Sequence, residues 1–242
     1  MIDADKFYEE TMARARAESE RLKQEWQTEF AQKRFHRILK AWQSGQSLSE
    51  IIETEPYHPY WSGKQLRGAS FRGINLKEAN LRGVFLDEAD FRGSNLEGAD
   101  FRGSDLAKAN FEGAILAEAN FEGCMLSKSN LHQANAVKAN FKGCFMSNSN
   151  LKEANLTSAQ LFKTSLDGCN LENANFTGAN LSEAVLIGAR LNGAIFDDAI
   201  LKGTRFGDYA QGKGLGLSQS ALNAIAKLDE IKEQIGEPSE NM

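Results

Sequence analysis

The sequence predicts a mainly β solenoid, a rod in which the backbone turns a corner after every five residues. From Leu66 to Phe206, every fifth position except one carries a large apolar residue. Of these 29 positions 18 are Leu and nine are Phe, and the remaining two are Met146 and Ala136. The residue two places earlier is nearly always Ala, Ser, Cys or Thr. A period of five fits neither an α-helix nor a flat strand, whose side chains repeat at about 3.6 and 2 residues.

The other positions of the unit are consistent with a chain that turns repeatedly. One large and one small residue per unit point inward and fill a narrow interior. Gly is common two places after the large residue, where it tolerates corner conformations that a Cβ would resist. Asn or Asp is common just before the large residue and can hydrogen-bond to local backbone. A disordered repeat would not keep large apolar residues at 28 of 29 fixed positions.

The units at residues 79–83, 89–93 and 179–183 are similar to the consensus of pentapeptide-repeat proteins. This resemblance covers residues 64–208. It implies a right-handed quadrilateral parallel β-helix, with four pentapeptides in each 20-residue coil. The array then makes about seven coils, and a coil spacing of about 4.8 Å gives a rod roughly 35 Å long. The resemblance implies a bacterial source but fixes no function, because one fold serves many.

We expect three parts in the chain: an α-helical N-terminal extension and cap at 1–63, the solenoid at 64–210, and a C-terminal capping helix and tail at 211–242. The stretch from residue 3 to about 43 lacks Gly and Pro and is rich in helix formers. Leu22, Trp26 and Phe30 recur there at helical spacing. This helix has either a solvated outer face or a face that binds a partner.

The C-terminal stretch predicts an amphipathic helix from Ser218 to about Gln234. Its apolar stripe consists of Leu222, Ile225, Leu228 and Ile231. The helix seals the last coil, or it also pairs with a second copy of the chain. Relatives that act on DNA gyrase dimerise through such a cap, and the resemblance therefore implies a possible homodimer.

Nothing in the sequence indicates a catalytic, cofactor or metal site. None of the three histidines stands at ligand spacing to a cysteine or another histidine. Cys124, Cys144 and Cys169 all fall at the small inward position, which predicts buried thiols and no redox pair. The glycines follow the five-residue period and form no phosphate-binding motif. We therefore expect no enzymatic activity, no cofactor and no small-molecule substrate.

Charge and hydropathy limit the partners further. The net charge of -5 argues against direct nucleic-acid binding through a basic field. No apolar run approaches the roughly 18 residues of a membrane span. The N-terminus lacks a classical secretory signal, so we expect a cytoplasmic protein, with signal-less secretion left open.

These features predict a protein–protein interaction scaffold that docks a partner on one face of the solenoid. The alternatives are a DNA mimic that binds DNA gyrase or topoisomerase IV, of the quinolone-resistance type, and a bacterial secreted effector. Residues 64–208 hold 16 basic and 17 acidic side chains, whereas a mimic needs a continuous negative stripe. Basic outward residues also cluster in the first coils, at Arg67, Arg72, Lys77, Arg82, Arg92 and Arg102.

The residue just before each large core residue points outward, and one series of these positions is unusually apolar. It contains Phe85, Met125, Phe145 and Val185, and Ile187 extends it. Concentrated apolar groups on one face mark a contact surface. The N-terminal helix, a second copy or an external partner covers this surface. In each case we expect the stripe to be less accessible than on a bare rod.

Overall fold

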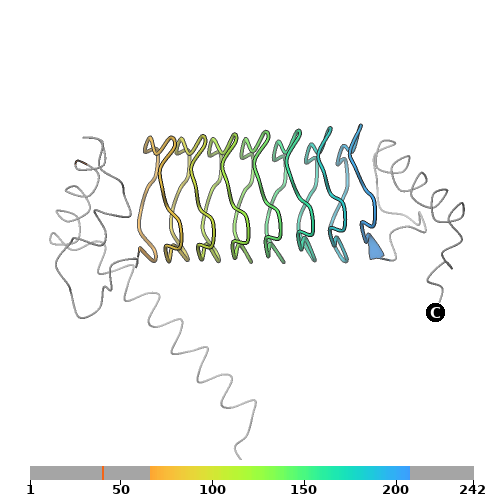
Figure 1. Cartoon of the computed structure of the whole chain (residues 1–242), viewed down its shortest axis with the longest axis horizontal. Coiled ribbons are helices and arrows are strands. Elements are labelled where there is room, and N and C mark those ends of the chain that lie inside the picture. Colours follow the sequence, from red (N-terminus) through yellow and green to blue (C-terminus); the bar gives the residue numbers. More distant parts are fainter. Residues whose placement is uncertain (1–39, 41–65, 208–242) are drawn as a thin grey trace, which may run out of the picture.

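The repeated units stack into a rod of similar coils. The computed structural model describes Lys40 and residues 66–207, and Figure 1 shows residues 66–207 as this rod. Parallel β-bridges join residues 20 apart, from Ser70 with Asp90 to Val185 with Arg205. Each coil therefore takes four pentapeptides and the rod has four sides, as the resemblance implied. The predicted terminal helices lie outside the described residues.

Each pentapeptide contributes one bridging residue rather than a long strand, and within 66–207 the bridges are isolated. The amide of Phe71 donates to the carbonyl of Asp90 at 2.7 Å, and the amide of Asp90 donates back to Ala69 at 2.9 Å. The amide of Gly73 also donates to the next coil, to Arg92, at 2.9 Å. These bonds satisfy the backbone groups that a chain with so many corners would otherwise leave unpaired.

A tight turn closes each unit. The amide of Ile74 donates to the carbonyl of Phe71 at 3.1 Å, and equivalent bonds recur along the rod. The second residue after each large core residue has positive φ in every turn from Gly68 to Gly203. Half of these residues are glycine and half are not; Gly123 has φ 70 and Lys128 has φ 61. This is the geometry of a type II turn, for which glycine is the favoured residue.

The interior is filled by the large residues of successive coils. Phe71, Phe91 and Phe111 stack in a column with ring centroids 4.8 and 4.9 Å apart. A second column contains Phe101 and Phe121, whose centroids lie 4.8 Å apart. Rings of the two columns meet edge to face. The spacing of the rings matches the spacing of the coils, so each ring contacts the next without changing its rotamer or plane.

Candidate interaction surface

The residues just before the large core residues form four outward rows, one on each side of the rod. Face A consists of Phe85, Asp105, Met125, Phe145, Ser165, Val185 and Arg205. Face B consists of Ser70, Asp90, Asn110, Asn130, Asn150, Asn170 and Arg190. Face C consists of Asn75, Asn95, Ile115, Asn135, Asn155, Asn175 and Ile195. Face D consists of Asn80, Asp100, Asn120, Asn140, Gln160, Asn180 and Ile200.

Asn and Asp in these rows stabilise the turn that follows them. The amide of His132 donates to Oδ1 of Asn130, and the amide of Lys152 donates to Oδ1 of Asn150, each at 3.2 Å. Among the described residues, every Asn or Asp of the four rows except Asn135 accepts such a bond. Oδ1 thus accepts a hydrogen bond from a turn amide that does not reach the neighbouring coil.

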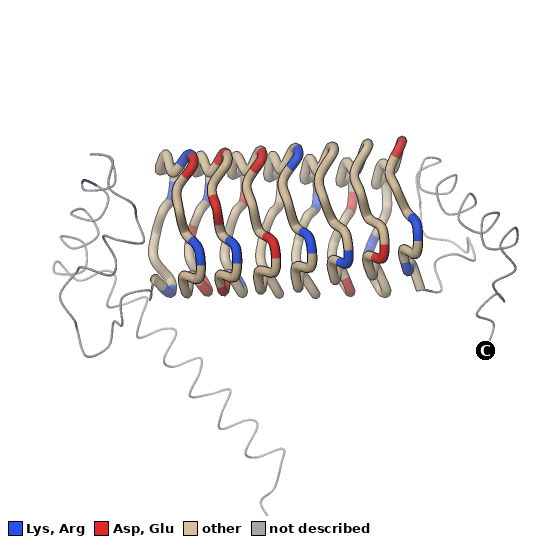
Figure 2. The backbone as a smooth tube through the Cα atoms, in the orientation of Figure 1, with Lys and Arg blue, Asp and Glu red and all other residues tan. Residues whose placement is uncertain are grey.

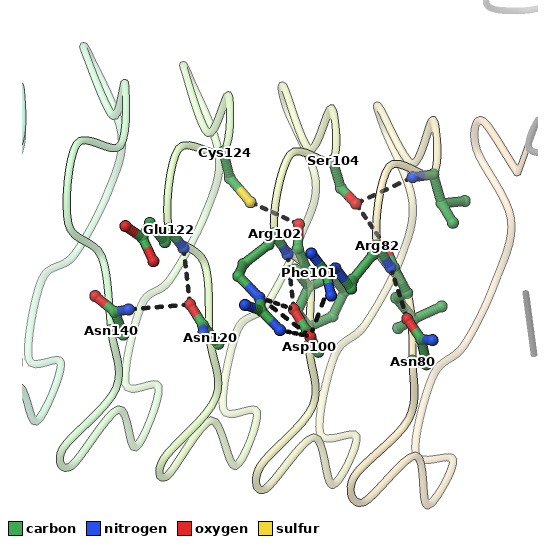
Figure 3. A network of polar contacts seen from close by, with 12 residues as sticks. Asn80, Arg82, Asp100, Phe101, Arg102, Ser104, Asn120, Glu122, Cys124 and Asn140 are labelled. Carbon is green, nitrogen blue, oxygen red and sulfur yellow. Dashed lines mark hydrogen bonds and ion pairs between the residues drawn. The ribbon is translucent and has the colours of Figure 1, made fainter. Parts of the chain in front are cut away.

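The amides of face B also bind one another from coil to coil. Nδ2 of Asn130 donates to Oδ1 of Asn110 at 3.1 Å, and Nδ2 of Asn150 donates to Oδ1 of Asn130 at 3.0 Å. Asn140 and Asn120 repeat this arrangement on face D, where Figure 3 shows it beside the turn bonds. The outward residues of these faces therefore contribute to the cohesion of the rod itself.

Face A lacks most of these bonds. Only Asp105 accepts the turn bond there, from the amide of Ala107 at 3.1 Å. Phe85, Met125 and Phe145 have no acceptor to offer, and they expose 39%, 48% and 59% of their surface. Each replacement of an Asn by such a residue forgoes a hydrogen bond worth about 0.5–1.5 kcal/mol. The apolar composition of face A is therefore not explained by the folding of the rod.

Two further predicted residues complete the exposed stripe. Val185 lies on face A and is half-buried. Ile187 lies on the adjoining turn and is 41% exposed. Exposed isoleucines also occur elsewhere, at Ile115 on face C and Ile200 on face D. These two are isolated from each other, whereas the apolar residues of face A recur along one row.

The interior directly behind face A contains the largest set of polar small residues, and a smaller set lies behind face B. The small inward residues behind face A include Ser104, Cys124, Cys144 and Thr164, where other sides carry mostly Ala. Each donates its hydroxyl or thiol hydrogen to a carbonyl of the preceding coil. The distances to the carbonyl oxygen are 2.6 Å for Ser104, 2.8 Å for Cys124, 2.7 Å for Cys144 and 2.8 Å for Thr164. Side-chain donors thus link successive coils from within behind face A, as Ser149 and Cys169 also do behind face B.

The three cysteines are buried, as the sequence predicted, and their thiols stay protonated. Burial raises the pKa of the Cys124 and Cys169 thiols to about 12. Burial also raises the pKa of the Cys144 thiol. Since the thiolate is the reactive form, thiols held protonated in this way neither bind metals readily nor exchange disulfides.

Two aromatic contacts beside face A were not anticipated from the sequence. Nζ of Lys163 lies 5.0 Å from the ring centroid of Phe162, on the turn that leads into face A. Phe162 occupies the position after a large core residue, whereas the predicted stripe was traced mainly through the positions before them. The guanidinium of Arg67 lies 5.5 Å from the ring centroid of Phe85, and it also forms an ion pair with Asp87 at 2.9 Å. Burial raises the pKa of the Asp87 carboxyl.

Charges are interspersed along the described rod, as Figure 2 shows. Five of the six basic residues in the first coils lie within ion-pair distance of carboxylates. Arg92 binds Asp90 and Arg102 binds Asp100, each with a closest distance of 2.6 Å, and these bonds lower the pKa of both carboxyls. The basic cluster that the sequence indicated is thus largely neutralised by its own neighbours, as Figure 3 shows for Arg82 and Arg102.

The part of the chain that the structure describes holds no cluster of His, Cys, Asp and Glu able to bind a metal ion. Within the same residues, no helix has the length and apolar character needed to cross a bilayer. The predicted pairing residues of the C-terminal helix, Leu222, Ile225, Leu228 and Ile231, lie outside the described residues.

Comparison with known proteins agrees with the five-residue geometry. A family model described as pentapeptide repeats matches eight copies, over residues 69–107, 104–143, 129–168 and 164–203. The chain belongs to the pentapeptide-repeat family. No curated protein matches its sequence significantly.

Several solved structures of pentapeptide-repeat proteins are similar to this one. HetL, involved in heterocyst differentiation regulation in the cyanobacterium Nostoc, is 26% identical, with 58% of this chain and 84% of HetL covered at a TM-score of 0.32. Rfr23 from the cyanobacterium Cyanothece is 21% identical, with 59% and 86% covered and a TM-score of 0.36. A trypsin-treated form of QnrB1, a plasmid-mediated fluoroquinolone resistance protein, is 20% identical, with 73% and 99% covered and a TM-score of 0.38.

Proposed function

We propose that this pentapeptide-repeat protein is a non-enzymatic scaffold, a right-handed rod of about seven coils that docks a protein partner on face A. One observation supports this most directly. At Phe85, Met125, Phe145 and Val185 the chain has apolar side chains where an Asn would hydrogen-bond to the following turn. A row that is exposed and that lowers local stability is best explained by binding outside the rod.

The chemistry of the rod supports binding rather than catalysis. The shifted carboxyls, such as Asp90 and Asp100, lie on ridges in contact with arginines. A catalytic dyad needs a pocket in which two such groups meet a substrate. The interspersed charge also favours a scaffold over a mimic of DNA, which needs a continuous negative stripe. We further propose a cytoplasmic protein without a cofactor, in which the C-terminal helix caps the last coil.

Capture of interacting proteins from the native host, with a Phe85→Ser/Phe145→Ser variant in parallel, tests the proposal. We expect the parent to capture a partner and the variant to lose most of it, because both aromatic anchors are removed. The matched control is Ile115→Ser/Ile200→Ser, which removes two apolar residues with similar exposures of 42% and 54% from other faces. This control should bind the partner as the parent does.

Far-ultraviolet circular dichroism must show the same fold for all three proteins. A Phe85→Ser/Phe145→Ser variant that retains the parent's partner, in the same amount, would show that face A is not the docking surface. Equal losses in the variant and in the control would show that general surface hydrophobicity causes the capture. Either result would end the assignment of the function to face A.

A further inference from the structure

We propose that the occupant of face A is a second copy of this chain, packed antiparallel against the first about a twofold axis. This inference rests on the proposed function, because it names the partner of the same surface. The axis lies between the coil of Met125 and the coil of Phe145. The two rods lie side by side, and each contributes the same face.

The order of residues along face A is the observation that carries this proposal. From residue 85 to residue 185 the row reads Phe, Asp, Met, Phe, Ser, Val. The pattern of apolar and polar residues is the same in both directions. A twofold interface brings a surface against itself in reverse order, so it requires this symmetry. A surface for an unrelated partner does not.

In the reversed register each apolar residue of face A faces an apolar residue of the second copy, and each polar residue faces a polar one. Met125 meets Phe145 of the second copy, and Phe85 meets Val185. The polar pair consists of Asp105 and Ser165; the hydroxyl of Ser165 donates to Asp167 at 2.6 Å within its own chain and would have to rotate to donate to Asp105. Faces B and D give no comparable match, since face B has no apolar residue and face D has only Ile200. Face C is symmetric about Asn155, but its two isoleucines, Ile115 and Ile195, lie four coils apart with only amides between them.

The turns that lead from face D into face A, which include Glu122 and Lys142, form one border of face A and extend the match. A transverse twofold axis brings this border against the same border of the second copy. Glu122 then faces Lys142, and these two residues already lie 3.7 Å apart within one chain. The four charges of two copies can therefore alternate around the axis. Arg102 faces Phe162, which allows a cation–π contact.

The same border is low enough for two rods to approach. Its turns carry Gly83, Gly103, Gly123 and Gly143 in four successive coils. A Cβ placed on Gly103, Gly123 or Gly143 would meet nothing within 4 Å in its own chain, so these corners present bare backbone outward. On the opposite border Asp87 faces Ile187, and the charge of Asp87 is already matched by Arg67 at 2.9 Å.

The size of the face indicates a reversible dimer. A side of five residues measures at most about 16 Å across, and the rod is roughly 35 Å long. The two copies together would then bury roughly 1,000 Å², the lower end of specific interfaces. We therefore expect self-association in about the micromolar range rather than an obligate dimer.

Charge exchange between two variants of the full chain tests the interface and its register. Phe145→Lys should break the dimer, because each introduced ammonium would face the apolar Met125 of the other copy. Met125→Asp should break it in the same way, because each introduced carboxylate would face the electron-rich ring of Phe145. Each should weaken self-association at least about a hundredfold. Mixing the two variants should restore a one-to-one dimer, since the ammonium of one variant then faces the carboxylate of the other, and the second pair stays native.

Analytical ultracentrifugation gives the mass, and small-angle X-ray scattering gives the length. The dimer should be about as long as the monomer, because the rods lie side by side. Dimerisation end to end through the C-terminal helices would nearly double the length and overturn the proposal. Mixing Phe145→Lys with Phe145→Asp should restore nothing, because both charges would face Met125 in the antiparallel register. Recovery in that mixture would show a parallel arrangement and also overturn it.

Ile115→Lys and Ile200→Asp are the matched surface controls, and both should dimerise as the parent does. A parent that stays monomeric well above micromolar concentration would overturn the dimer. The proposed function would survive that result if the Phe85→Ser/Phe145→Ser variant still lost an external partner. Loss of that partner and monomeric behaviour are therefore separable outcomes.

Discussion

Faces A and B share the same core and the same turns, and they differ mainly in one outward residue per coil. On face B, Asn110, Asn130 and Asn150 hydrogen-bond to the following turns and to one another. On face A, Met125 and Phe145 do neither and remain exposed. The comparison shows that folding and binding depend on different positions of the pentapeptide. The inward residues specify the rod, and the outward residue either joins coil to coil or is free to bind something else.

The largest effect is expected where both faces depend on the same residue. Leu156 is fully buried among apolar side chains, and Leu156→Asp places an unpaired charge there. We expect a loss of several kcal/mol and no folded protein. Circular dichroism should show the β signal disappear. Leu156→Met, which conserves volume, should fold normally; equal behaviour of the two variants would mean that the interior is not tightly packed.

Exchanging the outward residues should move stability in opposite directions on the two faces. Phe145→Asn supplies an acceptor for the amide of Ser147, and we expect a gain of about 0.5–1.5 kcal/mol together with weaker binding by face A. Asn150→Phe removes the bond from Lys152 and the bond to Asn130, and we expect a loss of about 1–2 kcal/mol.

Guanidinium denaturation at low protein concentration measures both changes without a contribution from self-association. Phe145→Ala serves as the control, since it removes the ring without adding an acceptor. If Phe145→Asn and Phe145→Ala are equally stable, the turn bond contributes nothing and the contrast between the faces loses its energetic basis.

A smaller effect should come from the turns on the two borders of face A. Gly123 has φ 70 and open space around its missing Cβ within its own chain, so Gly123→Ala tests backbone strain alone when the protein is too dilute to self-associate. We expect a loss of about 1 kcal/mol. Lys128 also has positive φ, at 61, so Lys128→Gly relieves backbone strain. We expect this variant to gain a few tenths of a kcal/mol of stability or more. Thermal unfolding of both variants checks this, and a Gly123→Ala variant as stable as the parent would contradict it.

The smallest expected effect is the change in stability as the pH is lowered. The bonds from Arg92 and Arg102 lower the pKa of Asp90 and Asp100 below the ordinary value. Their stabilisation is therefore complete above the ordinary Asp pKa of about 3.9 and is lost as the pH falls through the lowered values. We expect a small contribution from each pair, since the pairs are exposed to solvent and screened by it.

Asp90→Asn/Asp100→Asn isolates this effect, because an Asn keeps the turn bond, as at Asn110. The double variant should lose less stability than the parent when the pH is lowered below about 4. Denaturation midpoints measured across that range compare the two. Parallel pH profiles would show that the ion pairs contribute nothing.

The sequence predicted the core almost completely, because a strict period leaves one solution for residues such as Leu156 and Phe121. It also predicted the exposed stripe, since Phe145 and Met125 interrupt a polar row. The pairing of Arg92 with Asp90 was not predicted. Whether two residues on either side of a corner approach each other depends on turn geometry, which residue types alone do not specify. Phe162 was missed for a related reason, because its position in the turn had no expected polarity.

The uninterrupted ladder of bridges between residues 20 apart has a consequence for insertions and deletions. Removing one unit of five residues preserves the inward pattern, so the core still closes. Every unit beyond the deletion then advances by a quarter of a coil, and its outward residues move to the neighbouring face. Removing four units shortens the rod and leaves each row in line. Which face an outward residue occupies thus depends on the number of pentapeptides that precede it. That number can change in one step while every inward position still carries one large or one small residue, although the buried stacks gain new neighbours at the deletion.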